Sequence, residues 1–420
     1  MKKMSTLNVA LLVRAVQPLH GVGGLERYAD ELVRYLLKSD VQIDLITQRP
    51  KRPQSTAMSD WLARDGLTTH FVPYRTFPFA GRRGTTVLDR STAYPLFGWR
   101  AGRLAWRLVR RGGITLVHGN GASVCGYASA RARNRIETVP FVFNPQGLEE
   151  FGATDPQRAG LKRFGYWPLQ RAVIACARSA DRVIATDRVL RQPILDHLHV
   201  KDRVVRVVPN AVDLCRVDTI RQRGHHSYRE KRDVGPGSVL LSVGRLERNK
   251  GFDLLAAALA RVRASRQDVN WYWVVIGEGP FGSRLRRLVC KLGLSPCVRF
   301  LGKVDDDELH AWYDTATLFV HPTLYEGSSL VTLEAMAHGR AVVATRAGGL
   351  TDKVLPGVTG WLVQPGDVAA LASAVTDALR GESILPAMGQ AGRQLVEREF
   401  SWGVVIDRLL AVYDELLTYG

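Results

Sequence analysis

Cysteine and long apolar runs are both scarce in this chain. The five cysteines are an odd number, and their spacing fits neither a metal site nor a disulfide framework: Cys125, Cys176, Cys215, Cys290 and Cys297. No stretch approaches the roughly 18 to 20 uninterrupted apolar residues of a membrane-spanning helix. The basic start MKKMSTLNVALLVRAV does not fit a signal peptide, because Arg14 interrupts an apolar region of only about seven residues. These absences predict a protein of the reducing cytoplasm that begins with a buried strand.

Internal repeats and low-complexity sequence are also absent, so ordinary globular domains must account for the length. At 420 residues the chain is too long for one hydrophobic core, and we expect two domains of similar size. Its 46% hydrophobic and 23% charged residues are typical of a globular protein.

Acidic residues are scarce relative to basic ones, but only in the first half. Residues 1–212 contain 33 Lys and Arg against 16 Asp and Glu, an excess of 17, whereas residues 213–420 contain 25 against 24, an excess of 1. This asymmetry indicates that the first half faces an anionic partner, such as a phospholipid surface, an acidic glycan or nucleic acid. A surface that only aids solubility is the alternative.

Short apolar strands alternate with helical patterns along both halves. The first half contains LNVALLV, a helical pattern at 24–38, QIDLIT, ITLVHG, PFVFN and RVIAT, and the second contains SVLLSVGRL, WYWVVIGEG, VRFLGKV, LFVHPT, AVVATRAG and GWLV. Such alternation implies parallel sheets built from right-handed crossovers. We therefore expect an α/β protein of two Rossmann-like domains, joined near Pro209 and Asn210.

Ligands of open parallel sheets bind at the carboxyl ends of the strands, so the turns that follow strands are the first candidates. In HGVGGLERYADEL, the glycines Gly23 and Gly24 precede a helix, where free amides and close backbone approach favour an anion; a plain tight turn explains them equally well. In SVGRLERNKG, Arg245 and Lys250 follow a strand and can converge on a pyrophosphate. Basic residues that only solvate a loop are the alternative there.

Two further turns carry weaker signals. VIGEGPFGSRL is a glycine turn at a strand end, where a ligand can approach the backbone. The acids of RFLGKVDDDELHAWY could be mistaken for a metal site, but they open a helical pattern, where acids cap amides and complement the helix dipole. We therefore expect helix capping there and no metal.

The stretch HPTLYEGSSLVTLEAMAHG contains two glutamates that flank a helix start. Glu326 lies in the loop, followed by four residues whose amides can bind a phosphate: Gly327, Ser328, Ser329 and Leu330. Glu334 lies about one turn into the helix among apolar neighbours, so it needs a polar partner. A sugar hydroxyl and a ribose diol, one on each side of a phosphate, are natural ligands for the two carboxylates.

This E-x(7)-E element, together with GRLERNKG, GEGP, FLGKV, VPNAVD and AGGLTDKVLPGVTGWLVQPGD, resembles the retaining, family 4-like (group 1) glycosyltransferases of the GT-B fold. The resemblance extends from residue 8 to the end. It implies two Rossmann-like domains that face each other across a cleft: an acceptor-binding domain at 1–212, completed by a returning helix at 402–420, and a donor-binding domain at 213–401. The implied reaction moves a hexosyl or N-acetylhexosaminyl residue from a nucleotide diphosphate sugar to a glycan or lipid-linked acceptor, as in lipopolysaccharide, exopolysaccharide or glycolipid synthesis.

The resemblance also assigns roles to particular residues. It implies that Glu326 contacts the donor sugar with a catalytic role, that Glu334 binds the nucleotide ribose, and that the amides of Ser328, Ser329 and Leu330 bind sugar or phosphate. Arg245 and Lys250 match the cations on the diphosphate, and Gly23 and Gly24 match a glycine loop that closes over it. Backbone at Gly302, Lys303 and Val304 matches the part that reads the base, and His118 matches a histidine near the donor sugar with a catalytic role.

The sequence departs from the family at two places. Relatives often have E-G-F-G or E-x-F-G-L where this chain has Glu326, Gly327, Ser328 and Ser329, and a histidine often follows the strand where this chain has Pro145 and Gln146. The acceptor therefore does not transfer from the resemblance. Because fixed cations and amides can stabilise the leaving diphosphate, we expect no metal and no cofactor, and a front-face mechanism with retention.

The basic segment YPLFGWRAGRLAWRLVRR places Arg100, Arg103 and Arg107 at helical spacing. It can lie on an anionic membrane and bring a lipid-linked acceptor to the site, which would place the protein at the inner face of the cytoplasmic membrane. An ordinary sheet-packing helix with a basic outer face is an equal alternative. Nucleic acid is not expected as a partner, since no recognised module is present. A nucleotide-sugar epimerase of similar shape and a non-catalytic protein that binds anionic ligands are the rival functions.

Overall fold

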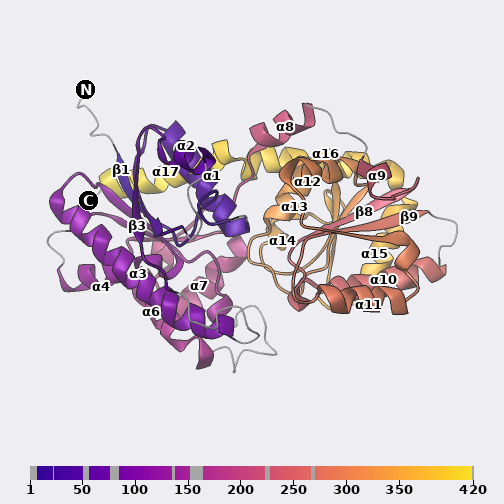
Figure 1. Ribbon diagram of the computed structural model, residues 1–420, viewed down its shortest axis with the longest axis horizontal. Helices are drawn as coiled ribbons and strands as arrows, with labels where there is room; N and C mark the ends of the chain where they lie inside the picture. The colour runs from indigo at the N-terminus through magenta and orange to yellow at the C-terminus, as the bar shows by residue number, and fades with distance from the viewer. Residues whose placement is uncertain are drawn as a thin grey trace. The chain divides into compact units, whose positions relative to one another are not determined.

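The computed structural model describes residues 7–21, 23–50, 56–75, 85–134, 138–151, 164–222, 228–265 and 270–418. The chain forms two compact units (Figure 1), Met1–Asn210 with Val405–Gly420, and Ala211–Val404. The sequence predicts bounds of 1–212 with 402–420 and of 213–401. Within the described ranges, no helix combines the length and the apolar character that crossing a membrane requires.

The first unit is built on a seven-stranded sheet in the order β3-β2-β1-β4-β5-β6-β7, in which every neighbouring pair is parallel. Its strand order reverses between β1 and β4, and ligands of such sheets bind beyond the carboxyl ends of the strands at this switch point. The strands are β1 (Asn8–Leu12), β2 (Gln42–Gln48), β3 (Leu67–Val72), β4 (Leu116–Asn120), β5 (Phe141–Asn144), β6 (Arg182–Ala185) and β7 (Val205–Val207).

Helices of the first unit have one apolar face each. In α1, for example, Ala29, Leu32, Val33 and Leu36 recur at helical spacing and are buried. The helices are α1 (Gly24–Lys38), α2 (Thr56–Leu62), α3 (Thr85–Arg111), α4 (Cys125–Arg133), α6 (Trp167–Ser179), α7 (Arg191–Leu198) and, from Val405 onward, α17 (Trp402–Thr418).

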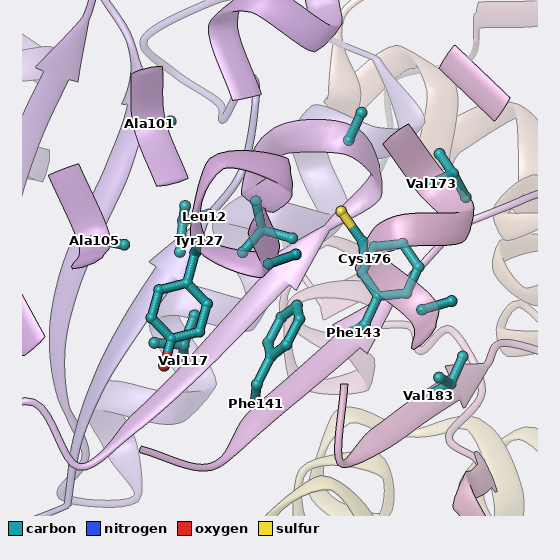
Figure 2. Close-up of a cluster of buried hydrophobic side chains, with 14 of the residues drawn as sticks. Leu12, Ala101, Ala105, Val117, Tyr127, Phe141, Phe143, Val173, Cys176 and Val183 are labelled. Atoms are coloured by element: carbon teal, nitrogen blue, oxygen red, sulfur yellow. The ribbon is translucent and has the colours of Figure 1, made fainter. Parts of the chain in front are cut away.

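The core of the first unit lies between the sheet and α3, α4 and α6. Figure 2 shows aromatic rings of this core in succession, with Tyr127 from α4 edge-on to Phe141 of β5 at 5.5 Å between ring centroids, and Phe143 beyond it at 6.4 Å. Both faces of the central strands are covered, since every residue of β4 and β5 is buried.

The second unit is built on a six-stranded parallel sheet in the order β10-β9-β8-β11-β12-β13, whose switch point lies between β8 and β11. Its strands are β8 (Ser238–Val243), β9 (Trp271–Ile276), β10 (Val298–Gly302), β11 (Leu318–His321), β12 (Ala341–Thr345) and β13 (Gly360–Val363). Its helices are α8 (Leu214–Gln222), α9 (Tyr228–Lys231), α10 (Phe252–Ser265), α11 (Gly282–Lys291), α12 (Asp306–Thr315), α13 (Leu330–Ala337), α14 (Leu350–Lys353), α15 (Val368–Arg380) and α16 (Leu385–Leu395).

Both expected series of parallel strands are confirmed, and each predicted strand is present. The sequence reading did not identify β3, whose LTTHFV is polar at its centre, or the three-residue β7. The acidic run at the start of α12 is a helix cap, as expected: the Asp305 carboxylate accepts a hydrogen bond from the amide of Glu308 at 2.8 Å.

Candidate functional site

A charged cluster lies at the switch point of the second sheet. His321 ends β11, and its Nε2 donates to Glu326 Oε2 at 2.7 Å. Lys250, in the turn that follows β8, donates from Nζ to the same oxygen at 2.8 Å. Because β8 and β11 are neighbours, the fold brings these three residues together from positions up to 76 residues apart.

The electrostatics of this cluster keep Glu326 ionised. Burial opposes ionisation, but the Lys250 ammonium and His321 together hold the pKa of the Glu326 carboxyl well below its usual range. Burial lowers the pKa of His321 against the opposing effect of Glu326, so the imidazole is neutral at pH 7. Within the described chain, the second oxygen of Glu326, Oε1, accepts no hydrogen bond and can accept one from a ligand hydroxyl.

The start of α13 follows directly and leaves backbone amides without partners among the described residues. Ser329 is its N-cap, and the Ser329 hydroxyl accepts from the amide of Thr332 at 3.3 Å. The amides of Gly327, Ser329 and Leu330 donate no hydrogen bond to any other residue that the structure describes. Free amides at a helix start attract phosphate, as the sequence predicts for this segment.

Glu334 lies in the second turn of α13 and is 6% exposed. A polar partner, which the sequence did not identify, is Tyr313 of α12, whose hydroxyl donates to Glu334 Oε2 at 2.8 Å. The Tyr313 ring in turn stacks on His338, with ring centroids 5.4 Å apart. His338 is fixed by hydrogen bonds of 2.7 Å to Asp314 and to His310. A packed polar network therefore holds the carboxylate in place.

Lys353 holds the other side of the same loop. It is fully buried at the end of α14, and its Nζ donates to the Ser328 hydroxyl at 3.1 Å and to the carbonyl of Gly349 at 3.3 Å. The backbone amide of Gly349 donates to the carbonyl of Gly327 at 3.0 Å, so α14 and the loop are bonded together. Ser328, at which the chain departs from the family pattern, is thus fixed by a buried ammonium.

The remaining residues predicted for the second unit lie at neighbouring strand ends. Arg245 follows β8, but its side chain is 71% exposed and pairs with Glu247 at 2.9 Å, so the expected convergence with Lys250 is not present. Gly302 ends β10 at φ 71°, its carbonyl accepts from the amide of Gly277 at 2.7 Å, and Lys303 and Val304 continue from it. Two strands, β9 and β8, separate β10 from β11.

Two predicted residues of the first unit lie between β1 and α1. Gly23 is the residue before α1, in extended backbone, and Gly24 begins the helix. An added Cβ at Gly23 would lie 2.3 Å from the carboxylate of Glu26, so the backbone and that side chain are in close contact.

His118 lies in the core of the first unit. It lies inside β4 with no exposed surface, and its Nδ1 shares a hydrogen bond of 2.6 Å with the Tyr413 hydroxyl of α17. Burial lowers the pKa of His118 to about 4, and the nearby Asn120 side chain opposes this only in part. His118 thus anchors the returning helix through Nδ1, while its Nε2 accepts or donates no hydrogen bond within the described residues, and its catalytic contact with the donor stays a prediction. The sequence gives no sign of the bond to Tyr413, because the two residues are 295 positions apart.

The basic segment forms the outer face of α3. Arg103 and Arg107 are exposed, Arg100 is half-buried, and the Arg103 guanidinium lies 5.4 Å from the centre of the Trp99 ring. Leu96 and Trp99 are 47% and 49% exposed. Trp106 of the same helix packs in the core.

Sequence reasoning did not identify His321, Tyr313 or Lys353. His321 ends a predicted strand, so its place beside the loop could have been inferred from the strand end. Tyr313 meets Glu334 only through the packing of α12 on α13, and Lys353 lies in the mixed segment LTDKVL, which gives no sign of a loop partner. In the described ranges, no group of three or more His, Cys, Asp or Glu side chains is placed to hold a metal ion.

Comparison with known families matches both units. Residues 22–216 match the family described as Glycosyltransferase Family 4, and residues 237–381 match Glycosyl transferases group 1. A D-inositol 3-phosphate glycosyltransferase of Geodermatophilus obscurus is 34% identical over 93% of this chain and 84% of its own length. The D-inositol 3-phosphate glycosyltransferase 1 of Catenulispora acidiphila is 30% identical over 100% of this chain and 97% of its own.

Solved structures share the fold of both units. A sucrose-phosphate synthase from Thermosynechococcus elongatus superposes with a TM-score of 0.74 at 22% identity, covering 99% of this chain and 100% of the other. Anabaena HepE in complex with UDP gives a TM-score of 0.71 at 18% identity, over 98% and 100% of the two chains. With two parallel α/β units, these similarities identify the GT-B fold.

Proposed function

Because the chain belongs to the group 1 glycosyltransferases with a family 4 N-terminal region, we propose that it transfers a hexosyl or N-acetylhexosaminyl residue from a nucleotide diphosphate sugar with retention of configuration. The observation that carries the proposal is the cluster of Lys250, Glu326 and His321 beside the free amides of α13. This arrangement places a cation and an anion-binding helix start next to an ionised carboxylate. A nucleotide diphosphate sugar offers a matching diphosphate and sugar hydroxyls.

Donor binding follows from the charges and donors of this site. Lys250 and the amides of Gly327, Ser329 and Leu330 bind the diphosphate, Glu326 Oε1 accepts from a sugar hydroxyl, and Glu334 accepts from the ribose. The exposed Arg245 side chain, which pairs with Glu247 in the structure, breaks this ion pair when the donor binds and contacts the diphosphate instead. The backbone at Gly302, Lys303 and Val304 binds the base. Anabaena HepE, which shares the fold, is a protein bound to UDP and to UDP-glucose, which fits such a donor.

The transition state of this transfer has positive charge on the sugar and negative charge on the departing diphosphate. Lys250 and the fixed amides stabilise the departing oxygens without reorganising, and they take the part that a metal ion has in other transferases. Glu326 cannot supply a proton at neutral pH, because its pKa is held far below 7. It therefore positions the sugar and stabilises the oxocarbenium-like centre, while the acceptor attacks from the face that the diphosphate leaves.

The acceptor is a glycan or a lipid-linked saccharide, as in lipopolysaccharide, exopolysaccharide or glycolipid synthesis, and the first unit binds it. The exposed Trp99 with Arg103 and Arg107 on α3 supports contact with an anionic membrane surface, at the inner face of the cytoplasmic membrane. Loss of binding to phosphatidylglycerol vesicles in the variant with Arg100, Arg103 and Arg107 changed to Glu is the expected result, and unchanged binding would contradict membrane contact.

A second acceptor class is suggested by the curated relatives, whose names specify D-inositol 3-phosphate. Such an acceptor is a soluble phosphorylated polyol. It shares phosphate and hydroxyl groups with lipid-linked saccharides, so both classes require the first unit to provide groups that bind phosphate and hydroxyls.

A transfer assay tests the proposal. UDP-glucose, UDP-N-acetylglucosamine, GDP-mannose and ADP-glucose are each incubated with the full chain and D-myo-inositol 3-phosphate or a lipid-linked saccharide, and nucleoside diphosphate release is measured. We expect release with one donor, the anomeric configuration retained by NMR of the product, and little change with EDTA. Glu326→Gln should lower the rate at least tenfold, whereas Glu230→Gln, exposed on α9, should not. An inverted product, or activity lost with EDTA and restored by magnesium, would contradict the mechanism.

A further inference from the structure

Two buried histidines lie close to the proposed ribose ligand Glu334, and neither has a role in the donor binding proposed for this site. His310 belongs to α12 and is 3% exposed, and His338 follows α13 with no exposed surface. Their rings are in contact, with a hydrogen bond of 2.7 Å between His310 Nδ1 and His338 Nε2 and 5.0 Å between the ring centroids. Because both rings are buried, neighbouring protein groups decide which nitrogen atoms carry protons.

The hydrogen bonds of the pair define one order of donors and acceptors. His338 Nδ1 lies 2.7 Å from Asp314 Oδ1, and the Arg221 guanidinium lies 3.1 Å from the same oxygen. A carboxylate paired with a guanidinium only accepts hydrogen bonds, so the proton of a neutral His338 lies on Nδ1. The Nε2 atom of His338 is then an acceptor, and His310 must donate to it from Nδ1. Each bond in this series therefore fixes the tautomer of the next ring.

The same pair restrains Tyr313, whose hydroxyl donates to Glu334. The Tyr313 ring stacks on His338 at 5.4 Å and 22°, and it meets His310 edge-on at 6.2 Å and 62°. Helical spacing explains these contacts, since His310 and Tyr313 are three residues apart on α12, and Glu334 and the C-cap His338 are four apart on α13. The two imidazoles thus hold the ring, and the ring holds the carboxylate at 2.8 Å.

One additional proton on the pair is incompatible with this arrangement. A proton on His338 Nε2 would face the N–H group of His310 across 2.7 Å, and two donors do not form a hydrogen bond. The two rings must then move apart, unless His310 gives up its own proton at Nδ1. Because both rings contact Tyr313, such a movement displaces the hydroxyl that holds Glu334.

The charges around the pair favour its neutral state. Burial lowers the pKa of His338, Asp314 opposes this, and Arg221 and Arg340 add to it, so the imidazole is neutral at pH 7. The described charged side chains on the elements packed against the pair include Asp306 and Asp314 of α12, Arg216, Asp218 and Arg221 of α8, Arg393 of α16, Glu397 of the segment Val396–Phe400, and Arg340 before β12. Every acid among these forms an ion pair with an arginine, so an imidazolium would compete for its charge.

We infer that His310 and His338 position Glu334 for the donor ribose: the neutral pair keeps the carboxylate where it accepts from both ribose hydroxyls, and one added proton weakens this contact. The inference rests on the proposed role of Glu334. It adds two positioning residues that do not touch the donor, and a dependence of donor affinity on pH that is confined to the ribose hydroxyls.

Isothermal titration of the full chain with UDP, GDP and ADP, and with the dideoxyribose form of the one that binds, measures this contact. The two forms share the base and the diphosphate, so the ratio of their dissociation constants reports the ribose hydroxyls alone. At about pH 7.5 the ribose form should bind at least about tenfold more tightly, as expected for hydrogen bonds to a charged group. At about pH 5 this ratio should decrease towards one, because the pair takes up a proton.

Variants of the pair assign the change to these residues. His338→Phe keeps a ring against Tyr313 but binds no proton, so its preference for ribose should be the same at both pH values. His310→Leu removes the donor to His338 and should reduce the preference at the higher pH, whereas His310→Asn, with an amide N–H near the position of Nδ1, should restore most of it. His70→Phe is the control and should behave as the wild type, since His70 also bonds to a carboxylate, Asp44 Oδ1 at 2.6 Å, but in β3 of the first unit.

A wild-type preference for ribose that is equal at both pH values, or a pH dependence that persists in His338→Phe, would overturn the inference while nucleotide binding itself remains. No binding of any nucleotide, or no preference for ribose at the higher pH, would instead contradict the proposed donor site, and the inference would fall with it. Thermal unfolding checks that each variant folds, and the comparison of the two pH values in the wild type depends on no variant.

Discussion

Replacing Lys250 with Met removes the ammonium from the cluster of Lys250, Glu326 and His321 while keeping a side chain of similar length. Glu326 then retains one partner, the neutral His321. Breaking a buried pair from one side costs about 3–5 kcal/mol, since an uncompensated charge stays behind. The Lys250 and Glu326 side chains are 20% and 12% exposed, which places the expected loss at the lower end, about 3 kcal/mol.

Urea and thermal unfolding of four variants measure this loss. A decrease of about 3 kcal/mol should lower the Tm of a unit of this size by about 6–12 °C. Lys250→Met with Glu326→Gln carries neither charge, so it should be more stable than the sum of the single effects predicts, by about 1.5 kcal/mol or more. Lys291→Met, exposed at the end of α11, is the control. Additive single effects, or Lys250→Met no less stable than the control, would refute the reasoning about the cluster.

Three further predictions concern other parts of the chain. Tyr313→Phe removes the hydrogen bond to Glu334 but keeps the stacked ring, so the KM for the donor in steady-state assays should rise about tenfold. An unchanged KM would show that Tyr313 does not position Glu334. The pKa of His118 is lowered to about 4, so its contribution to the free energy of unfolding should be complete above about pH 6.5 and should fall by about 3 kcal/mol as the pH decreases from there to 4. In urea unfolding at different pH values, His118→Gln should show a smaller decrease than the wild type. An equal decrease in both proteins would exclude His118 as its source. At Gly277, with φ 131°, an added Cβ would lie 2.0 Å from the carbonyl oxygen of Gly244, so Gly277→Ala should lower the free energy of unfolding by at least about 2 kcal/mol. The control is Gly403→Ala in α17, where an added Cβ meets no atom within 4 Å and should be neutral or slightly stabilising. Equal Tm values for the two variants in thermal denaturation would contradict this prediction.

The parallel sheets could be predicted from the sequence because fully buried strands are continuous apolar runs. β12, with AVVAT, is buried at every position, and so is β8, whose SVLLSV is apolar except for two serines. β3 escaped detection because its edge position leaves Thr68 exposed and lets polar residues interrupt the pattern.

The site was predictable where a local sequence segment forms it. The loop from Glu326 and the helix start up to Glu334 are contiguous, so spacing alone places them. The partners that fix these groups come from other elements: Lys250 through the pairing of β8 with β11, and Tyr313 through α12. His118 shows the opposite case, since its strand was predicted but α17 covers it.

The central claim, that the second unit binds a nucleotide diphosphate sugar through Glu334 and its neighbours, is tested most directly by thermal stabilisation of the purified chain. UDP, GDP, ADP and NAD are each added to the wild type and to Glu334→Ala, because a ligand that binds only the folded state raises the Tm. We predict that one nucleoside diphosphate raises the Tm, that NAD does not, and that Glu334→Ala loses the shift. No shift with any of the three diphosphates, or a shift that Glu334→Ala retains in full, would contradict the account.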